Sequence, residues 1–375
     1  MNDDTLRSLA GQYGTPLYVF DADSFKNRAS LCRKYFGDHI TLCYSMKANP
    51  FLLACLPEEI SMLEVCSPGE LTVCENAGAE LGSIVFSGVN KTLECVERAM
   101  DDHVAVFTAE SPLHLKHIEK AAADRNITVP VLMRLTSDNQ FGMDADLIVE
   151  LAKDHSDYPH VELVGLHYFS GTLKKRPTLI GRELDKMDAL AVRVKEACGI
   201  AFTRMEYGPG LWIDYFGEDP DQSEEQLLEE VSPLIRAMGD KYDLTVEMGR
   251  FYSAPSGTYL TTVMDTKTNC GFHYAIVDGG LHQMNYDGQM KGTQVPEIRF
   301  LADRVGGEED WCICGSLCTP NDVLVRRVPM PEPKPGDILA FCRTGGDSIC
   351  EGFALLLSRD VPAVVIWSEN NGARL

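Results

Sequence analysis

The stretch Tyr44-Ser45-Met46-Lys47-Ala48-Asn49-Pro50 decides how the rest of the chain is interpreted. An apolar run, Ile40-Thr41-Leu42-Cys43-Tyr44, leads into it and ends at a single lysine. The Asn-Pro pair that follows favours a turn, so the run is predicted to be a strand that stops there. A lysine at such a strand end lies at a sheet edge, where ligands bind in α/β folds. Taken alone, a strand-end lysine more often extends its amine into solvent than acts on a ligand.

Outward from Lys47, short apolar runs alternate with longer amphipathic runs from residue 40 to residue 250. The short runs are residues 41–46, 62–66, 84–87, 104–108, 129–135, 163–168, 203–207 and 244–247. The helical patterns between them include residues 69–77, 93–101, 112–125, 145–154, 179–197 and 226–240. Eight strands alternating with helices predict parallel pairing and closure as a (β/α)8 TIM barrel. A doubly wound open sheet is the alternative, but no Gly-x-Gly-x-x-Gly follows the first strand.

The pattern changes after Arg250. Strand-like runs with turns and little helix follow at residues 258–265, 274–277, 322–328 and 338–342. They predict a mainly-β C-terminal domain. Because residues 17–20 also look like a strand, we expect residues 1–26 to join this β domain together with 251–375. The barrel then spans residues 27–250.

Composition excludes several classes of protein. The chain has 375 residues, with 34 basic and 56 acidic side chains and a net charge of −22, which argues against nucleic acid or anionic membranes as partners. The first residues, Met-Asn-Asp-Asp, carry no basic and apolar signal segment, so a cytoplasmic protein is expected. Thirteen scattered cysteines then predict reduced thiols. Cys312-Ile313-Cys314 and Cys318 lack a matching pair at zinc spacing, and no metal site is predicted.

The residues just after the predicted strands are polar, titratable or glycine. They are Lys47, Glu64, Ser67, Ser87, Glu110, Arg134, His167, Ser170, Gly208, Pro209, Gly210, Glu247 and Arg250. A lysine in a water-poor pocket can attack an aldehyde, and glycine-rich turns offer backbone N–H groups to phosphate. A carboxylate can keep a pyridine nitrogen protonated. Each residue alone also has a plain explanation, as a core histidine, a turn or a paired surface charge.

Together these motifs closely resemble the fold-type III pyridoxal-phosphate decarboxylases, which include ornithine and diaminopimelate decarboxylases. The resemblance runs from Gly14 to about Pro362 in the family's order. The matching stretches are Tyr44–Asn49, Glu64–Leu71, His167–Gly171, Gly208–Gly210, Glu247–Arg250 and Gly315–Asp322. It implies an alanine-racemase-like barrel, pyridoxal 5'-phosphate as the cofactor and a homodimer with shared active sites.

The resemblance also implies a role for each motif residue. Lys47 would hold the cofactor covalently, His167 would lie over its ring, and Cys318 from the partner subunit would protonate the α-carbon after CO2 leaves. The implied cofactor-binding residues are Lys47, Glu64, His167, Ser170, Gly208, Gly210, Glu247 and Arg250. A thiol suits such a proton transfer, although a free cysteine is more often a small buried apolar residue.

Three departures from the family concern the substrate and the phosphate. Gly345-Gly346-Asp347 stands where the family has Gly-Ala-Tyr, and an aspartate facing a phosphate would repel it. Pro209 removes one backbone donor from the glycine turn. Residues 281–286 lack the arginine that diaminopimelate decarboxylases use for the distal carboxylate, and Thr319 replaces an acidic residue of diamine-forming members. The predicted substrate-binding residues are Arg134, Thr319, Asp322 and Asp347.

We therefore expect decarboxylation of an α-amino acid or of a derivative. The stretch Leu317-Cys318-Thr319-Pro320-Asn321-Asp322 is similar to that of members acting on derivatised amino acids. These are the carrier-protein-linked glutamate decarboxylase of butirosin synthesis and the citryl-diaminopropionate decarboxylase of siderophore synthesis. An acyl carrier protein is thus a candidate partner, although such partners are acidic like this chain. An amino-acid racemase and a non-catalytic regulator of decarboxylases remain the alternatives.

Overall fold

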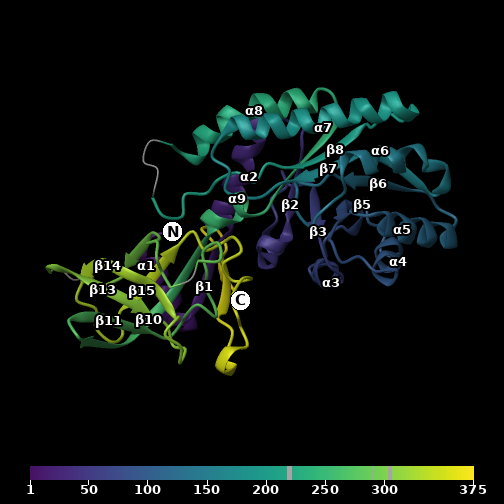
Figure 1. Ribbon diagram of the computed structural model, residues 1–375. Helices are drawn as coiled ribbons and strands as arrows, with labels where there is room; N and C mark the ends of the chain where they lie inside the picture. The colour runs from purple at the N-terminus through teal and green to yellow at the C-terminus, as the bar shows by residue number, and fades with distance from the viewer. Residues whose placement is uncertain (218–221, 290, 303–305) are drawn as a thin grey trace. The chain divides into compact units, whose positions relative to one another are not determined.

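The computed structural model describes residues 1–217, 222–289, 291–302 and 306–375 (Figure 1). These residues divide into two compact units. The barrel unit comprises residues 29–212 and 222–249, and the β unit comprises residues 1–28, 213–217 and 250–375. Helix α2 (Ala22–Phe36) begins in the β unit and ends in the barrel unit.

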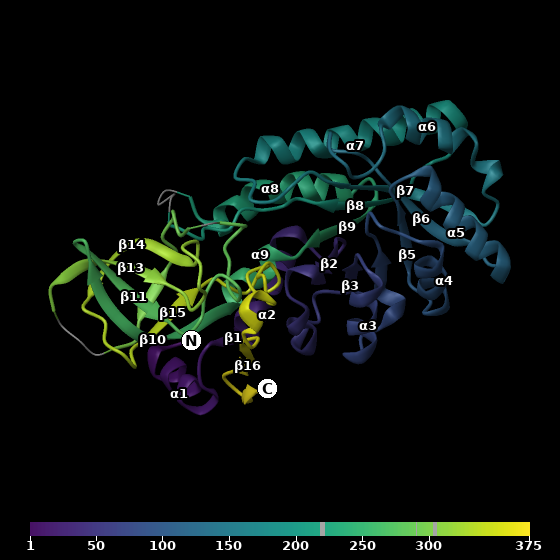
Figure 2. The same cartoon turned by 60° about the horizontal axis from the view of Figure 1, so that its bottom comes forward.

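Within the described residues of the barrel unit, eight parallel strands close into a barrel in sequence order (Figure 2). The strands are β2 (Thr41–Ser45), β3 (Met62–Val65), β4 (Ile84–Phe86), β5 (Val106–Ala109), β6 (Val129–Arg134), β7 (Val161–Phe169), β8 (Arg204–Gly208) and β9 (Asp243–Met248). The helices between them are α3 (Pro68–Asn76), α4 (Leu93–Asp101), α5 (Pro112–Arg125), α6 (Ala145–Lys153), α7 (Pro177–Cys198) and α8 (Glu224–Gly239). The predicted barrel is therefore confirmed.

Local sequence explains where the helices begin. Ser67 accepts a hydrogen bond from Glu70 N at 3.1 Å, and Pro68 takes the first position of α3. Ser111 caps α5 in the same way, with Pro112 after it. In a Ser-Pro pair, the serine oxygen accepts from a backbone N–H of the first helical turn, and the proline has no N–H that needs a partner. Each helix can therefore start directly after its strand.

One glycine is required by the barrel wall. A Cβ atom on Gly165 in β7 would lie 1.7 Å from the Arg204 carbonyl oxygen of β8. The β6–β7 register also shifts between Val131 and Leu132. Glycine therefore allows β7 and β8 to approach each other, which brings His167 and Glu206 into register.

The β unit is built on one mixed sheet, whose main path among the described residues runs β14-β13-β11-β10-β1-β16-β17. Its strands are β1 (Leu17–Asp21), β10 (Gly257–Asn269), β11 (Phe272–Val277), β12 (Ile298–Phe300), β13 (Glu308–Cys314), β14 (Val323–Pro331), β15 (Ile338–Cys342), β16 (Ala363–Ser368) and β17 (Gly372–Arg374). Its helices are α1 (Asp3–Tyr13) and the short α9 (Arg250–Ser253). Strand β1 pairs with both β10 and β16, so the N-terminal segment belongs to this sheet. The predicted mainly-β second domain is confirmed.

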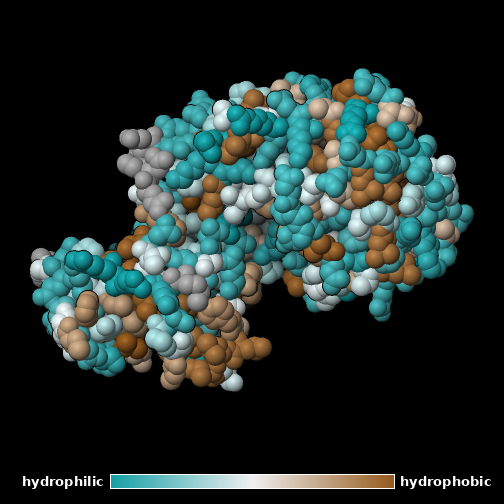
Figure 3. All heavy atoms as spheres, in the orientation of Figure 1, coloured by the Kyte–Doolittle hydropathy of each residue, from teal (hydrophilic) through white to brown (hydrophobic). Residues whose placement is uncertain are grey.

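The surface of the β unit carries an apolar segment. Figure 3 shows brown surface at its lower edge, where the C-terminal part of the chain lies in Figure 1. Leu355 is 92% exposed and Val361 is 73% exposed. The other large apolar side chains exposed within residues 353–361 are Phe353, Leu356 and Leu357. None of the helices in the described part of the chain has the length and apolar character to cross a membrane.

Candidate active site

Lys47 follows the end of β2, within the 3-10 helix η1 (Met46–Ala48). Its Nζ atom lies 2.8 Å from Glu64 Oε2 and 3.9 Å from Cys66 Sγ. The Lys47 side chain stays 45% exposed, whereas that of Glu64 is 2% exposed. Burial lowers the pKa of Lys47, but the negative charge of Glu64 outweighs burial and holds the pKa above its ordinary value. The amine is therefore protonated and paired.

The loop that carries Lys47 is held from two sides. Asn49 caps the next 3-10 helix, η2 (Pro50–Cys55), with its side-chain oxygen. A Cβ atom on Gly249, just after β9, would lie 2.7 Å from Ala48 Cβ and 2.8 Å from the Ser45 carbonyl oxygen. Because only glycine fits there, the ends of β2 and β9 stay close together.

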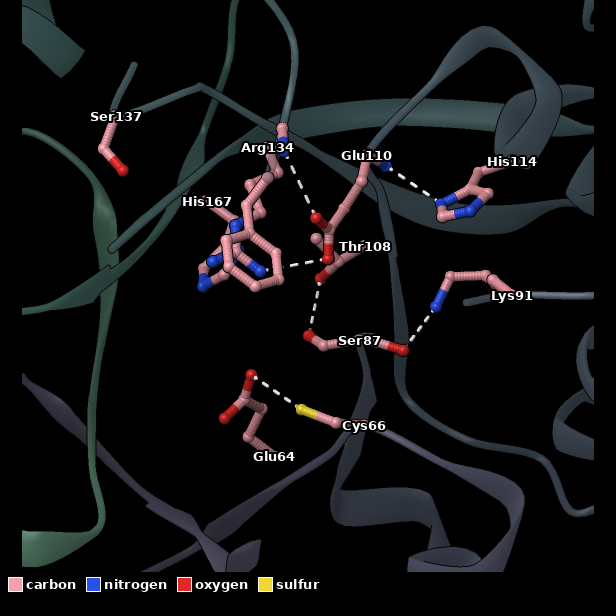
Figure 4. Close-up of polar contacts among 12 residues, drawn as sticks. Glu64, Cys66, Ser87, Lys91, Thr108, Glu110, His114, Arg134, Ser137 and His167 are labelled. Carbon is pink, nitrogen blue, oxygen red and sulfur yellow. Dashed lines mark hydrogen bonds and ion pairs between the residues drawn. The ribbon is translucent and has the colours of Figure 1, made fainter. Parts of the chain in front are cut away.

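Glu64 is the buried partner of Lys47. Burial raises the pKa of Glu64, but the charges of Lys47 and His167 and hydrogen bonds to its oxygens outweigh burial and lower the pKa to about 2. Cys66 Sγ donates to Glu64 Oε1 at 3.4 Å, as Figure 4 shows. Glu64 is therefore ionised at neutral pH.

His167 and Glu247 form a second buried pair. His167 Nε2 lies 3.0 Å from Glu247 Oε2, and both side chains are almost completely buried. Since a carboxylate only accepts, Nε2 carries the hydrogen. His167 Nδ1 is buried and has no hydrogen-bond partner among the described residues. One side-chain nitrogen or carboxylate oxygen from each of Glu64, His167 and Glu247 lies within 4.8 Å of the other two, so the two pairs form one cluster.

The turn Gly208-Pro209-Gly210 begins at the last residue of β8 and lies against residues 170–172. A Cβ atom on Gly208 would lie 2.7 Å from Phe169 and 3.0 Å from Glu247 Oε1. Gly210 has φ +55, and a Cβ atom there would lie 2.0 Å from the Gly171 carbonyl oxygen. Both glycines are therefore required for the two loops to approach each other.

Ser170 is held by a carboxylate that the sequence did not indicate. Its hydroxyl donates to Glu183 Oε1, while Lys174 Nζ lies 2.7 Å and Tyr207 OH 2.5 Å from Glu183 Oε2. Burial lowers the pKa of Lys174 from its ordinary value. One carboxylate of α7 thus accepts hydrogen bonds from three side chains next to the glycine turn.

Arg134 ends β6 and is buried. Its Nη1 lies 3.0 Å from Glu110 Oε1 (Figure 4). The guanidinium lies 4.9 Å from the centre of the Phe141 ring. Gly142 N donates to Glu110 Oε2 at 3.2 Å. Glu110 therefore fixes both Arg134 and the loop that follows it.

A second buried lysine, Lys91, follows β4. It donates to the carbonyl oxygen of Ser87, as Figure 4 shows, and lies 4.5 Å from the centre of the Phe86 ring. Burial lowers the pKa of Lys91 to about 8. Its amine is tied to the backbone of β4.

In the β unit, Arg250 is surrounded by carboxylates. Its Nε lies 2.6 Å from Asp347 Oδ2 and its Nη1 lies 2.5 Å from Asp287 Oδ1, with Glu351 at 3.6 Å from Nη2. The guanidinium also lies 5.9 Å from the centre of the Tyr215 ring. Asp347, which stands where the family has a tyrosine, is thus paired with Arg250.

Cys318, Thr319 and Asp322 share the loop after β13. Cys318 is exposed. Asp322 is buried, and its two oxygens accept hydrogen bonds from Leu281 N and Leu317 N, each at 2.8 Å. The Asp322 carboxylate therefore shapes the loop that presents Cys318. Thr319 Oγ1 accepts from Asn321 N at 3.3 Å, within the same loop.

The structure thus brings Lys47, Glu64, His167 and Glu247 into one cluster at the carboxyl ends of the barrel strands, with Ser170 and the glycine turn on neighbouring loops. It pairs Arg250 with Asp347 and sets Cys318, Thr319 and Asp322 on one loop of the β unit. Two acidic residues near the cluster were not predicted from the sequence: Glu183, and Glu206, a buried acid inside β8. An acidic residue between Met205 and Tyr207, in the middle of a parallel barrel strand, is the signal that indicates Glu206.

Comparisons with known proteins find similar sequences over most of the chain. The family model described as "Pyridoxal-dependent decarboxylase, pyridoxal binding domain" matches residues 22–254. The L-glutamyl-(BtrI acyl-carrier protein) decarboxylase of Niallia circulans is 25% identical and covers 98% of this chain and 92% of its own. Diaminopimelate decarboxylase of Haemophilus influenzae is 27% identical over 92% of this chain and 86% of its own.

Solved structures share the fold over nearly the whole chain. The crystal structure of AQ1208 from Aquifex aeolicus has a TM-score of 0.86 and 26% identity, covering 99% of this chain and 90% of its own. Diaminopimelate decarboxylase from M. jannaschii, solved with L-lysine, has a TM-score of 0.88 and covers 98% of this chain and 90% of its own. At 24% identity the second likeness concerns the fold alone.

Proposed function

Because the chain belongs to the pyridoxal-dependent decarboxylase family, we propose that the Lys47–Glu64–His167–Glu247 cluster is its active site. The family activity is the decarboxylation of an amino acid with pyridoxal phosphate. The observation that carries the assignment is the cluster itself, in which a lysine amine, two carboxylates and an imidazole meet within one barrel.

The residues present fit pyridoxal phosphate. His167 has a buried Nδ1 without a partner among the described residues, and the turn at Gly208 and Gly210 leaves no room for a Cβ atom. When bound, the cofactor supplies an aldehyde for a lysine amine and an electron-poor ring that accepts the electron pair released with CO2. Lys47 would hold the aldehyde end, Glu247 the ring nitrogen and the glycine turn the phosphate.

Lys47 and Glu64 would carry out the first proton transfer, in which the Lys47 ammonium group loses its proton. A protonated amine is not a nucleophile, so Lys47 must lose its proton before it reacts. Glu64 Oε2, at 2.8 Å from Nζ, is within reach to accept that proton. Glu64 also keeps the amine oriented along the end of β2.

Ser170 and Gly210 would face the phosphate. Gly210 and Gly171 belong to two loops in direct contact, and such loops offer backbone N–H groups to anions. The Ser170 hydroxyl is a further donor once it leaves Glu183. Arg250, the implied phosphate neighbour, has three carboxylates around it instead.

Cys318 would deliver the proton that replaces CO2 on the α-carbon. We propose that it does so across a homodimer, as the family resemblance implies. Two observations support an interface: Cys318 is exposed, and residues 353–361 present five large apolar side chains to solvent. Such exposed apolar segments mark protein–protein contacts. A cytoplasmic location is proposed on the thirteen free thiols.

The substrate is proposed to be an amino acid with a derivatised or carrier-linked distal end. Asp322 is unsuited to bind a distal ammonium group, since its side chain is buried and its oxygens accept from two backbone N–H groups of the surrounding loops. The first relative described above acts on a glutamyl group linked to a carrier protein. Arg134 and Thr319 are the remaining candidates for substrate contacts, and Asp347 contributes only if it leaves Arg250.

The direct test is CO2 release from the cofactor-loaded protein. The panel holds lysine, ornithine, arginine, meso-diaminopimelate, glutamate, an acylated amino acid and a carrier-linked glutamate. We expect release from a derivatised member and little from the free diamino acids. Release from meso-diaminopimelate alone would overturn the substrate proposal while keeping the active-site assignment. Silence across the panel with cofactor bound would favour a non-catalytic relative.

A further inference from the structure

Glu206 is a third carboxyl group inside the barrel, and no residue role described so far includes it. It lies in the middle of β8, in register with His167 of β7 and Thr245 of β9. Its side chain is 1% exposed, and its Oε1 atom has no hydrogen-bond partner among the described residues. A carboxyl group so deeply buried needs either a cation or a proton.

The groups facing Glu206 leave it without a cation. Glu64 on β3 and Glu247 on β9 carry negative charge, and Cys43 on β2 is a buried thiol whose pKa is raised well above its ordinary value, so it supplies no positive charge. The two nearby nitrogen-bearing side chains are already paired, Lys47 with Glu64 and His167 with Glu247. Arg204, on the same strand, pairs with Asp243.

The Glu206 carboxyl group also lies within side-chain hydrogen-bonding reach of Glu247 on the neighbouring strand β9. Two carboxylates cannot bond to each other, because both only accept; one of the pair must carry a proton. Glu247 has His167 as a donor, whereas Glu206 has no donor of its own. Burial, followed by the charges of Glu247 and Glu64, raises the pKa of Glu206 well above its ordinary value.

We propose that Glu206 is a positioning residue that stays protonated and donates its proton in a hydrogen bond to Glu247. Glu247 then accepts one hydrogen bond from Glu206 and one from His167, which orients its carboxylate and makes it a poorer proton acceptor. A proton shared between Glu247 and the ring nitrogen of the cofactor would therefore stay on the nitrogen. This last consequence rests on the role proposed above for Glu247.

Infrared spectroscopy of the cofactor-loaded full-length protein tests the protonation directly. A protonated carboxyl group has a carbonyl band well separated from carboxylate bands, so the wild type minus Glu206→Gln difference spectrum should show one such band at neutral pH. Glu119→Gln is the matched control, since the Glu119 carboxylate pairs with His160 at 2.8 Å outside the cluster. If the wild type minus Glu206→Gln difference spectrum shows no protonated-carboxyl band, the proposal is wrong.

A second measurement asks whether the donated hydrogen bond is what matters. Glu206→Gln keeps a donor of the same size, and Glu206→Leu does not. We expect the cofactor dissociation constant to stay within about twofold in Glu206→Gln and to rise about tenfold in Glu206→Leu, as for loss of one buried hydrogen bond. The visible spectrum of bound cofactor should become pH-dependent only in Glu206→Leu. Equal effects in both variants would overturn the donor role.

The two proposals fail in different ways. If Glu247→Gln left cofactor affinity and spectrum unchanged, the role of Glu247 would be wrong, but the protonated-carboxyl band of Glu206 would remain. If that band were absent while Glu247→Gln impaired cofactor binding, only the Glu206 proposal would fall. Should Glu206→Leu not fold, the infrared comparison of wild type and Glu206→Gln decides alone.

Discussion

The barrel cluster (Lys47, Glu64, His167, Glu206 and Glu247) and the Arg250 cluster (Arg250, Asp287, Asp347 and Glu351) both bring several carboxyl groups close together. They balance the negative charge in different ways. Inside the barrel, Glu64 and Glu247 each face a nitrogen base, and the third acid, Glu206, is proposed to keep a proton. In the β unit, one guanidinium faces Asp287, Asp347 and Glu351, which leaves a surplus of two negative charges.

The difference follows from access to water. Glu64 and Glu247 are almost fully buried, whereas Asp287 is 40% exposed and Glu351 is 35% exposed. Solvent screens the surplus around Arg250, but nothing screens an unpaired charge in the barrel. We therefore expect a charge change in the barrel to be far more damaging than a similar change around Arg250.

Removing the barrel cation should have the largest effect. Lys47→Ala should reduce CO2 release by at least about 10³-fold and abolish the visible absorbance of bound cofactor, because the nucleophilic amine is lost. Steady-state kinetics and absorbance spectra measure both. Lys120→Ala, which removes an exposed lysine paired with Asp124, serves as the control. Persistence of the absorbance band in Lys47→Ala would show that another amine holds the cofactor.

The second largest effect should come from Cys318 in the β unit, where a proton donor is removed without removing a charge. Cys318→Ala removes no charge pair, yet it should lower turnover about 10²-fold through loss of the proton donor. Cofactor affinity should not change. The exposed Cys270 gives a matched control, Cys270→Ala. Mixing Lys47→Ala with Cys318→Ala chains should restore activity if the site is shared between subunits, and no recovery would argue against a shared site.

The third effect concerns stability in acid. The pKa of Glu64 is about 2 in the folded chain against 4.5 ordinarily, so the unfolded chain binds more protons between these values. The stabilisation is complete above about pH 4.5 and is lost as the pH falls towards 2, by up to ~1.4 kcal/mol per pH unit. Denaturant titration should show this slope in wild type and not in Glu64→Gln. An unchanged slope in the variant would mean that Glu64 is not paired in solution.

Glu64→Gln should also be less stable at neutral pH, by about 2 kcal/mol, because Lys47 loses its carboxylate partner. Because the Lys47 side chain is 45% exposed, this loss of stability is smaller than the loss expected for a fully buried ion pair. Glu119→Gln provides the comparison for a peripheral pair.

The smallest effect should come from the Arg250 cluster. Asp347→Asn removes one of three carboxylates and keeps a residue that tolerates the left-handed backbone at φ 64. We expect stability to change by less than about 1 kcal/mol and cofactor to bind about threefold more tightly, since Arg250 is less neutralised. Asp310→Asn, at an exposed pair with Arg327, is the control. Weaker cofactor binding in Asp347→Asn would reverse the interpretation of this cluster.

Much of the barrel was predictable from sequence. All eight predicted strands overlap the observed ones, because parallel strands buried on both faces appear as apolar runs and the Ser-Pro pairs mark helix starts. The family resemblance is confirmed by the match over residues 22–254. The β unit was harder: α1, β12, β13, β16 and β17 were not predicted. Strand β13, for example, begins with three exposed acidic residues.

The partners of the site residues were beyond sequence reasoning. Asp347 lies 97 residues from Arg250 along the chain, and nothing local indicates their contact. Glu183 sits on a long amphipathic helix where a charge normally indicates a solvent face. Long-range pairing depends on the fold, so local patterns predicted which residues are present at the site but not which of them contact one another.

Glu183 has a consequence for the order in which the holoenzyme is assembled. Ser170, Lys174 and Tyr207 all donate to this one carboxylate. If Ser170 is to donate to the phosphate, it must first leave Glu183, so cofactor loading is an exchange of hydrogen bonds rather than the filling of a ready-made pocket. Two events of different speed are then expected on mixing apoprotein with cofactor: a rapid encounter, followed by a slower rearrangement whose rate is set by Glu183.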